Sequence, residues 1–213
     1  MTDSAAPPPR AVVLVPVKSF SDAKVRLAGV LDERSRAELA RSMATRVLHA
    51  AAPLPVAVVC DDDDVAKWAI DNGASAIHTD RVGLNPAVAF GVSFLAADDV
   101  ERVIVAHADL PFATGLAALG DAAVDEVVLV PDRRGDGTNV ASIPTGRNFT
   151  FHYGPGSFRA HCDEARRLGL TVRVLESTVL GWDVDEPDDL YAPAALGTIP
   201  GAGSPDEQRA NPT

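Results

Sequence analysis

Several classes of protein are excluded by what this sequence has little of. The 213 residues include only two cysteines, Cys60 and Cys162, which are too few and too far apart for a disulfide framework or a cysteine-based zinc site. Aromatic residues make up 5% of the chain, so valine, alanine and leucine must build its interior. That composition favours parallel strands and helices over an aromatic-rich β-sandwich. The sequence also lacks a signal peptide and an apolar run long enough to cross a bilayer, so we expect a cytoplasmic protein without a membrane partner.

Positive charge is scarce as well. The chain has 19 lysines and arginines against 30 acidic residues, which gives a net charge of −11. A surface this acidic argues against broad binding of nucleic acid, and no nucleic-acid partner is expected. Familiar fingerprints are missing too: no Walker or dinucleotide glycine motif follows a strand, and no Ser-His-Asp or Cys-His arrangement can be assigned. A small pocket with concentrated positive charge remains compatible with these numbers.

The order of apolar segments predicts one α/β domain. We expect a disordered leader at residues 1–10, a single domain at 11–197 and a flexible tail at 198–213, because both ends are rich in proline and small or polar residues. Strands are expected at 11–17, 56–60, 74–79, 102–109, 126–132, 138–144 and 171–177, and helices at 32–51, 61–73, 85–99, 113–123 and 157–169. Such alternation predicts three layers, with a mostly parallel sheet covered by helices on both faces. Ligands bind such sheets beyond the carboxyl ends of the strands.

A basic loop follows the first expected strand. Lys18, Lys24 and Arg26 lie within nine positions of one another in "KSFSDAKVR". Cations grouped at the end of a strand suit the phosphates of a nucleotide. Ordinary surface lysines in a solvated loop would give the same pattern, so both interpretations stay open.

Acidic residues follow two other strands. Asp109 ends the strand-like "RVIVAHAD", and Asp183 and Asp185 are two positions apart in "WDVDEP", so an extended backbone would point both to one side. Carboxylates from separate strand ends form a set of hard oxygen ligands suited to Mg²⁺, the usual ion of nucleotidyl transfer. The alternative for Asp109 is an N-cap of the following helix. Asp188 and Asp189 are expected to cap or flank a short helix and are left out of the site.

A glycine-rich approach to a helix is the third candidate element. Gly154 and Gly156 precede Ser157, which is expected to cap the helix at 157–169, and such a helix start with free N–H groups suits a phosphate or carboxylate. Thr138 and Asn139 could add neutral hydrogen bonds. A plain capped loop is the alternative. Two weaker candidates are His161, one turn into this helix, and the start of the acidic run 61–64, which could line a base pocket.

Taken in order, these segments resemble one family, the phosphoenolpyruvate/2-phospho-L-lactate guanylyltransferases of coenzyme F-420 biosynthesis. The resemblance covers about residues 11–192 and rests on "VPVKSFSDAKVRLAGVL", "GLNPAV", "HADLP", "GDGTNV", "YGPGSFRAH" and "WDVDEPDDL". It implies the nucleotide-diphospho-sugar transferase fold of the molybdenum-cofactor guanylyltransferase type. One departure is His107-Ala108 before Asp109, where many relatives carry a glycine next to the acid.

The resemblance also implies roles for individual residues. It assigns Mg²⁺ to Asp109, Asp183 and Asp185, with Asp109 also catalytic. It places Thr138, Gly154 and Ser157 against the phosphorylated acid. It gives Lys18, Lys24 and Arg26 a catalytic role on the nucleotide phosphates, and it sets Leu84 and Asn85 near the nucleoside.

The implied reaction condenses GTP with phosphoenolpyruvate to give enolpyruvyl-diphospho-guanosine and pyrophosphate. The alternative acid is 2-phospho-L-lactate, and a downstream transferase of the same pathway is a further candidate partner. Two hypotheses of other classes remain: a glycosyltransferase or sugar-nucleotide enzyme on the same fold, and a non-catalytic nucleotide-binding module. The sequence does not reveal the base preference or the oligomeric state.

Overall fold

The computed structural model describes residues 10–199. Apart from Arg10, Thr198 and Ile199, the expected leader and tail lie outside the described residues. Ile199 is buried in a cluster with Leu27, Leu39 and Val184, so packed structure extends into the first residues of the expected tail.

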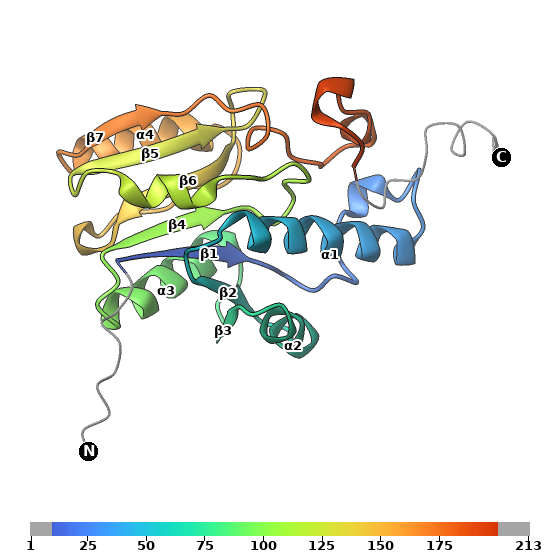
Figure 1. Cartoon of the computed structure of the whole chain (residues 1–213), viewed down its shortest axis with the longest axis horizontal. Helices are drawn as coiled ribbons and strands as arrows, with labels where there is room; N and C mark the ends of the chain where they lie inside the picture. The colour runs from blue at the N-terminus through green and yellow to red at the C-terminus, as the bar shows by residue number, and fades with distance from the viewer. Residues whose placement is uncertain (1–9, 200–213) are drawn as a thin grey trace, which may run out of the picture.

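Seven strands form one sheet in the order β3-β2-β1-β4-β6-β5-β7 (Figure 1). They are β1 Ala11–Pro16, β2 Val56–Cys60, β3 Ser75–His78, β4 Arg102–Ala106, β5 Glu126–Pro131, β6 Thr138–Pro144 and β7 Thr171–Val174. Strand β6 runs antiparallel to β4 and β5, and the other pairs are parallel. The expected mostly parallel sheet is confirmed, with one strand in each expected segment.

Helices cover both faces of the sheet, as predicted. They are α1 Glu33–Ala50, α2 Asp63–Asp71, α3 Leu84–Ala97 and α4 Ser157–Arg167. Five short 3₁₀ turns complete the described elements: η1 Val25–Leu27, η2 Leu116–Asp121, η3 Thr145–Arg147, η4 Pro187–Leu190 and η5 Ala194–Leu196. Because strand side chains alternate, Val13 and Val15 of β1 pack with α1, α2 and η2, whereas Val12 and Leu14 pack with α3 and α4. The chain therefore folds as three layers.

Three local predictions were wrong. The helix expected at 113–123 is only the 3₁₀ turn η2, which starts after Gly115 in a left-handed conformation (φ 70°). Helix α3 begins at Leu84 after Gly83, because the side chain of the expected cap Asn85 is bonded elsewhere. Helix α4 begins at Ser157 itself, with Gly156 as its cap. The Asp32 cap of α1 was predicted correctly.

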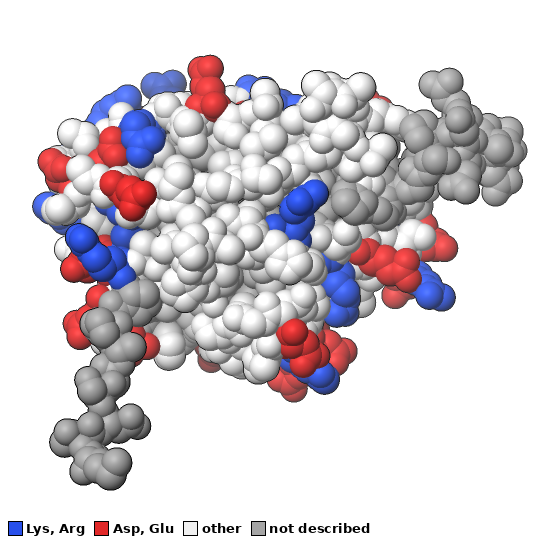
Figure 2. All heavy atoms as spheres, viewed as in Figure 1, with Lys and Arg blue, Asp and Glu red and all other residues white. Residues whose placement is uncertain are grey.

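Charged side chains on the face seen in Figure 2 lie mostly toward its rim, with both signs mixed. Among the described residues that this view shows, no broad basic patch covers the middle of the face, which is largely uncharged. In the described part of the chain, no helix has the length and apolar character that a membrane span needs.

The second half of α4 is tied by Glu164 to the loop that precedes the helix, and replacement of Glu164 by glutamine should lower stability. The buried carboxylate accepts hydrogen bonds from Arg167 (2.7 and 2.8 Å) and from the Thr150 N–H (2.9 Å). These contacts, that with Arg167 foremost, lower the pKa of Glu164 from 4.5 to about 2. We expect Glu164→Gln to lower the free energy of unfolding at pH 7 by about 1 kcal/mol, because the charged hydrogen bonds weaken.

The pH dependence of the free energy of unfolding tests this prediction. A carboxylate whose pKa is lower in the folded state stabilises the fold above pH 4.5, and this contribution is lost as pH falls toward 2. Urea unfolding of wild type and variant should therefore show a difference at pH 7 that shrinks below pH 4. A difference that stays constant across this range contradicts the assignment. Asp163→Asn, which removes an exposed carboxylate paired with Arg159 and Arg166, serves as the control for the loss of exposed ion pairs.

Candidate functional site

Two adjoining cavities open at the carboxyl ends of the parallel strands. The first has a volume of about 270 Å³ and reaches Lys24, His107 and Asp109. The second has a volume of about 230 Å³ and reaches Asp61 and Thr79 after β2 and β3. Both are also lined by Pro16, Val17, Lys18 and Leu84. The shared residues make one continuous site that runs from the end of β2 to the end of β4, where the sheet architecture predicts a ligand.

Lys24 is the cation at the centre of this site. Its ammonium group donates to Asp109 Oδ2 (2.7 Å) and to Asp185 Oδ1 (3.0 Å). Its side chain is 13% exposed, and the Lys24 backbone is left-handed (φ 54°). Burial alone would lower the pKa of Lys24, but the two carboxylates raise it, so the ammonium is charged. Burial alone would raise the pKa of Asp109, which is also largely enclosed, but the charge of Lys24, the neighbouring His107 and the hydrogen bond from Lys24 together lower it.

Asp183 lies in the same group of charges but lacks a close cation. Its carboxylate is 3.9 Å from the Arg133 guanidinium and 3.5 Å from the Asn139 amide. Burial, and then the negative charges of Asp109 and Asp185, raise the pKa of Asp183 to about 6. A carboxylate crowded by like charges is stabilised by an additional cation.

The three aspartates do not form the expected enclosed metal site. Among residues 10–199, no three acidic, histidine or cysteine side chains are grouped so as to hold a metal ion. The reason is Lys24, whose ammonium lies between the carboxylates of Asp109 and Asp185. The carboxylates that remain available suit the common arrangement in which Mg²⁺ is bound by one or two carboxylates together with substrate phosphates. Asp109 Oδ1 is buried without a hydrogen-bond partner among the described residues, and Asp183 is crowded by negative charge, so these two are the residues that fit a cation.

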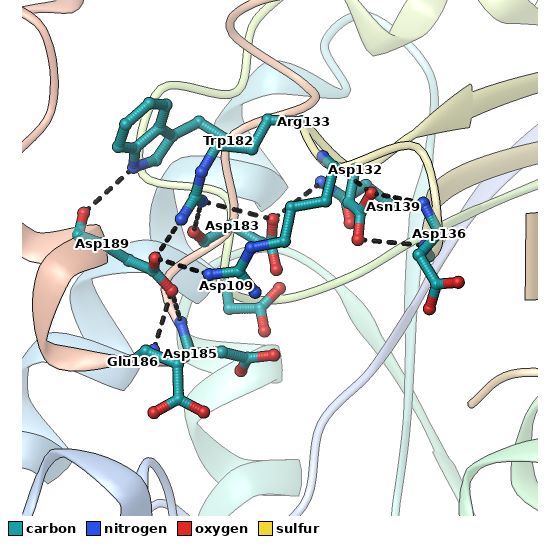
Figure 3. A network of polar contacts seen from close by, with 12 residues as sticks. Asp109, Asp132, Arg133, Asp136, Asn139, Trp182, Asp183, Asp185, Glu186 and Asp189 are labelled. Atoms are coloured by element: carbon teal, nitrogen blue, oxygen red, sulfur yellow. Dashed lines mark hydrogen bonds and ion pairs between the residues drawn. The ribbon is translucent and has the colours of Figure 1, made fainter. Parts of the chain in front are cut away.

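A buried carboxylate shapes the segment that carries Asp183 and Asp185. Asp189 is fully buried, and its Oδ2 accepts the backbone N–H groups of Asp185 and Glu186, both at 2.7 Å (Figure 3). Its Oδ1 forms an ion pair with Arg133, whose guanidinium stacks on the Trp182 ring at 4.3 Å. Asp189 lies within η4 rather than before it: Glu186 is the N-cap, and Asp189 is its partner in a capping box that also fixes the backbone of the two acids. The sequence analysis left Asp189 outside the site and missed Arg133, because only the fold shows that they meet.

The predicted acid-binding elements come together, but one feature was wrong. The hydroxyl groups of Thr138 and Ser157 lie 3.5 Å apart, beside the glycine turn that contains Gly154. The first N–H groups of α4, however, are not free. The N–H of Gly156 donates to the Asp136 carboxylate (3.0 Å), and that of Phe158 donates to the Asp136 carbonyl (3.0 Å). The two hydroxyls are therefore better candidates than the helix amides for contact with an anion.

The other predicted residues differ in how closely they approach the cavities. Lys18 and Leu84 line both cavities. Arg26 is largely exposed and pairs with Glu186 at 3.3 Å, beside the acidic segment. Asn85 lines neither cavity: its amide donates to the Tyr153 carbonyl (3.0 Å) and accepts the Tyr153 N–H (2.7 Å). These two hydrogen bonds tie Asn85 to the backbone of Tyr153, and its expected place near the nucleoside stays a prediction.

His107, noted in the sequence only as a departure, lines the larger cavity two residues before Asp109. Its ring lies 4.9 Å from that of Tyr153, and its Nε2 is buried without a partner among the described residues. Burial lowers the pKa of His107, so its ring is neutral at neutral pH. A neutral histidine here adds no charge to the site.

Comparison with known proteins places these features in a wider group. Residues 11–195 match the family described as "Guanylyl transferase CofC like". The chain is 35% identical over 193 residues to a phosphoenolpyruvate guanylyltransferase of Rubrobacter xylanophilus, covering 87% of this chain and 94% of the relative. It is 32% identical over 183 residues to a 2-phospho-L-lactate guanylyltransferase of Methanothermobacter thermautotrophicus, covering 83% and 81%.

Among solved structures, a putative nucleotide-diphospho-sugar transferase from Desulfovibrio desulfuricans superposes with a TM-score of 0.70. It is 19% identical in sequence, and the match covers 85% of each chain. At this identity the likeness concerns the fold alone, and it confirms the fold class expected from the sequence.

Proposed function

Because this chain belongs to the CofC-like guanylyl transferase family and is a nucleotidyltransferase, we propose that it condenses GTP with phosphoenolpyruvate in coenzyme F-420 biosynthesis. The products are enolpyruvyl-diphospho-guanosine and pyrophosphate. Five relatives, among them that of Rubrobacter xylanophilus, are named for phosphoenolpyruvate. The relative from Methanothermobacter thermautotrophicus is named for 2-phospho-L-lactate, which is the second candidate acid. The resemblance found in the sequence is confirmed at the level of the family.

The observation that carries the proposal is the continuous pair of cavities that ends at Lys24 and Asp109. The smaller cavity, beyond β2 and β3, suits a purine base, and the larger one, with Lys18 and Lys24, suits the phosphates. In this arrangement the α-phosphorus lies toward the carboxylates of Asp109 and Asp183. The acid then approaches from the side of Thr138 and Ser157.

The reaction needs positioning more than acid-base chemistry. A phosphate oxygen of the acid attacks the α-phosphorus of GTP, a new P–O bond forms, and the bond to the β-phosphate breaks. Pyrophosphate leaves with the electron pair. The attacking phosphate is already ionised, because its second pKa is about 6. The protein therefore has to hold two polyanions in line, which is a task for fixed charges and hydrogen-bond donors.

The residues divide this task between them. Lys18 and Lys24 neutralise the triphosphate and the leaving pyrophosphate. Asp109 and Asp183 would hold Mg²⁺, which when bound supplies further charge neutralisation at the phosphates. Asp185 keeps Lys24 in place from the side opposite Asp109.

The function is tested by incubating the protein with Mg²⁺, each of the four ribonucleoside triphosphates and each candidate acid. Pyrophosphate release and mass spectrometry of the products identify both substrates. We expect the mass of enolpyruvyl-diphospho-guanosine only with GTP and phosphoenolpyruvate. Transfer to a sugar phosphate would favour a sugar-nucleotide enzyme, and GTP binding without pyrophosphate release would favour a non-catalytic module.

Asp61 is the side chain of the smaller cavity best suited to read guanine. A carboxylate accepts the two adjacent N–H groups of guanine, which adenine does not offer in that arrangement. We expect Asp61→Asn to lower kcat/KM for GTP by about 10- to 100-fold and to leave that for ATP nearly unchanged. Steady-state pyrophosphate assays with both nucleotides measure this. Asp64→Asn, an exposed acid on α2, is the control, and an equal effect of both variants contradicts the assignment.

A further inference from the structure

His161 is fully buried beneath the acid-binding elements, and no step of the reaction above uses it. It lies on α4, one turn after Ser157, and three aromatic rings surround it. The ring centroids of Phe149, Phe151 and Tyr153 are 5.8, 6.3 and 4.8 Å away. Packing of this kind holds the imidazole in one orientation, so its two nitrogens have fixed partners.

Those partners determine which nitrogen carries the proton. Nε2 accepts the backbone N–H of His152 at 2.9 Å, so Nε2 is unprotonated. Burial, together with the nearby His152 and His107, lowers the pKa of His161 to about 4, so the ring is neutral at neutral pH. A neutral imidazole carries one proton, and in His161 this proton must be on Nδ1.

The protonated Nδ1 faces Thr138 Oγ1 at a distance of 3.0 Å. Thr138 therefore accepts this bond, and its own hydroxyl proton points elsewhere. Ser157 Oγ, 3.5 Å away, also donates to Thr138 Oγ1, at the long end of hydrogen-bonding distance. Thr138 Oγ1 thus accepts from His161 and from Ser157, and its own hydroxyl proton is directed away from both.

We infer that His161 is a positioning residue that orients the hydroxyl group of Thr138 as a donor toward an anionic oxygen of the phosphorylated acid. The inference rests on the proposed function, since it concerns the same acid. A hydroxyl that is free to rotate offers a lone pair as readily as a proton, and a lone pair repels an anion. A hydroxyl that already accepts a hydrogen bond from His161 offers its proton to the acid.

Two substitutions separate this hydrogen bond from the packing of the ring. Asparagine at position 161 places an amide N–H near the former Nδ1 and can still donate to Thr138. Glutamine places its amide one carbon further out, where it can accept from the His152 N–H but leaves Thr138 without a donor. Both variants lose the imidazole ring, so a purely structural role would make them similar.

We expect His161→Gln to raise KM for phosphoenolpyruvate by about tenfold or more, with KM for GTP within about twofold of wild type. His161→Asn should stay within about threefold of wild type for both substrates. In a Thr138→Val background the difference between the two variants should disappear. Equal acid KM values in the two variants, or a parallel rise in KM for GTP, overturn the inference.

A second measurement does not depend on turnover. Long-range ¹H–¹⁵N spectra of the wild-type protein report which imidazole nitrogen is protonated, and the His161 signal is identified by its contacts with the Phe149 and Tyr153 rings. A proton on Nδ1 supports the inference, and a proton on Nε2 overturns it. Absence of guanylyl transfer by the wild-type protein refutes the proposed function instead, so the two failures are distinguishable.

Discussion

Asp109→Asn is expected to lower the rate of guanylyl transfer by about a thousandfold or more while the protein stays folded. The substitution keeps the shape of the side chain but removes the charge that pairs with Lys24 and that would hold the cation. Single-turnover assays at saturating GTP and acid measure the loss, and circular dichroism reports the fold. Asp183→Asn should show a loss of similar size.

Asp188 provides the matched control, because it lies in the same acidic segment but is exposed, whereas Asp183 is partly buried. Asp188→Asn should keep activity within about twofold of wild type, as expected of surface substitutions. Full activity of Asp109→Asn at limiting Mg²⁺ would remove Asp109 from the site. Loss of activity in all three variants would show that the effect comes from net charge rather than from position.

Lys24→Met is expected to have the second large effect. The ammonium group is the contact that joins Asp109 to Asp185, and it faces the cavity proposed for the phosphates. Its loss leaves the largely enclosed carboxylate of Asp109 without a counter-charge, which should lower the free energy of unfolding by about 3 kcal/mol. It should also lower kcat by about 100-fold or more, because the leaving pyrophosphate loses a cation.

Product inhibition separates these two consequences of the Lys24 substitution. If Lys24 binds the leaving group, the inhibition constant for pyrophosphate should rise in Lys24→Met and be partly restored in Lys24→Arg, which keeps the charge but not the geometry. Unchanged inhibition by pyrophosphate, together with a lower free energy of unfolding, would limit Lys24 to a structural role.

The layers of the fold were predictable because each strand carries its own signal. The segment "AVVLVP" of β1 is apolar throughout, and every position except the last, Pro16, is buried. The same local reasoning failed for η2. Gly120 there packs against Ala11 and Leu54, where a Cβ would come within 3.2 Å of each, so tertiary contacts decide the conformation of that segment.

The site was predictable only in part, for a related reason. The acids and lysines at strand ends could be found, because sheet topology brings strand ends together. Their pairing could not, since Lys24 is separated by 85 positions from Asp109 and by 161 from Asp185. The sequence therefore suggested three metal ligands where the structure shows a lysine between two of them. Likewise, nothing local indicated that the amide of Asn85 is occupied by the backbone of Tyr153.

The central claim, that a phosphate oxygen of the acid attacks the α-phosphorus of GTP, has a direct test. Phosphoenolpyruvate labelled with ¹⁸O in its non-bridging phosphate oxygens is converted with unlabelled GTP, and the product is observed by ³¹P NMR. The account predicts an isotope shift on the phosphorus attached to guanosine, because a labelled oxygen becomes the bridge, and no label in pyrophosphate. An unshifted guanosine phosphorus would contradict it, since the new bond would then have come from another oxygen.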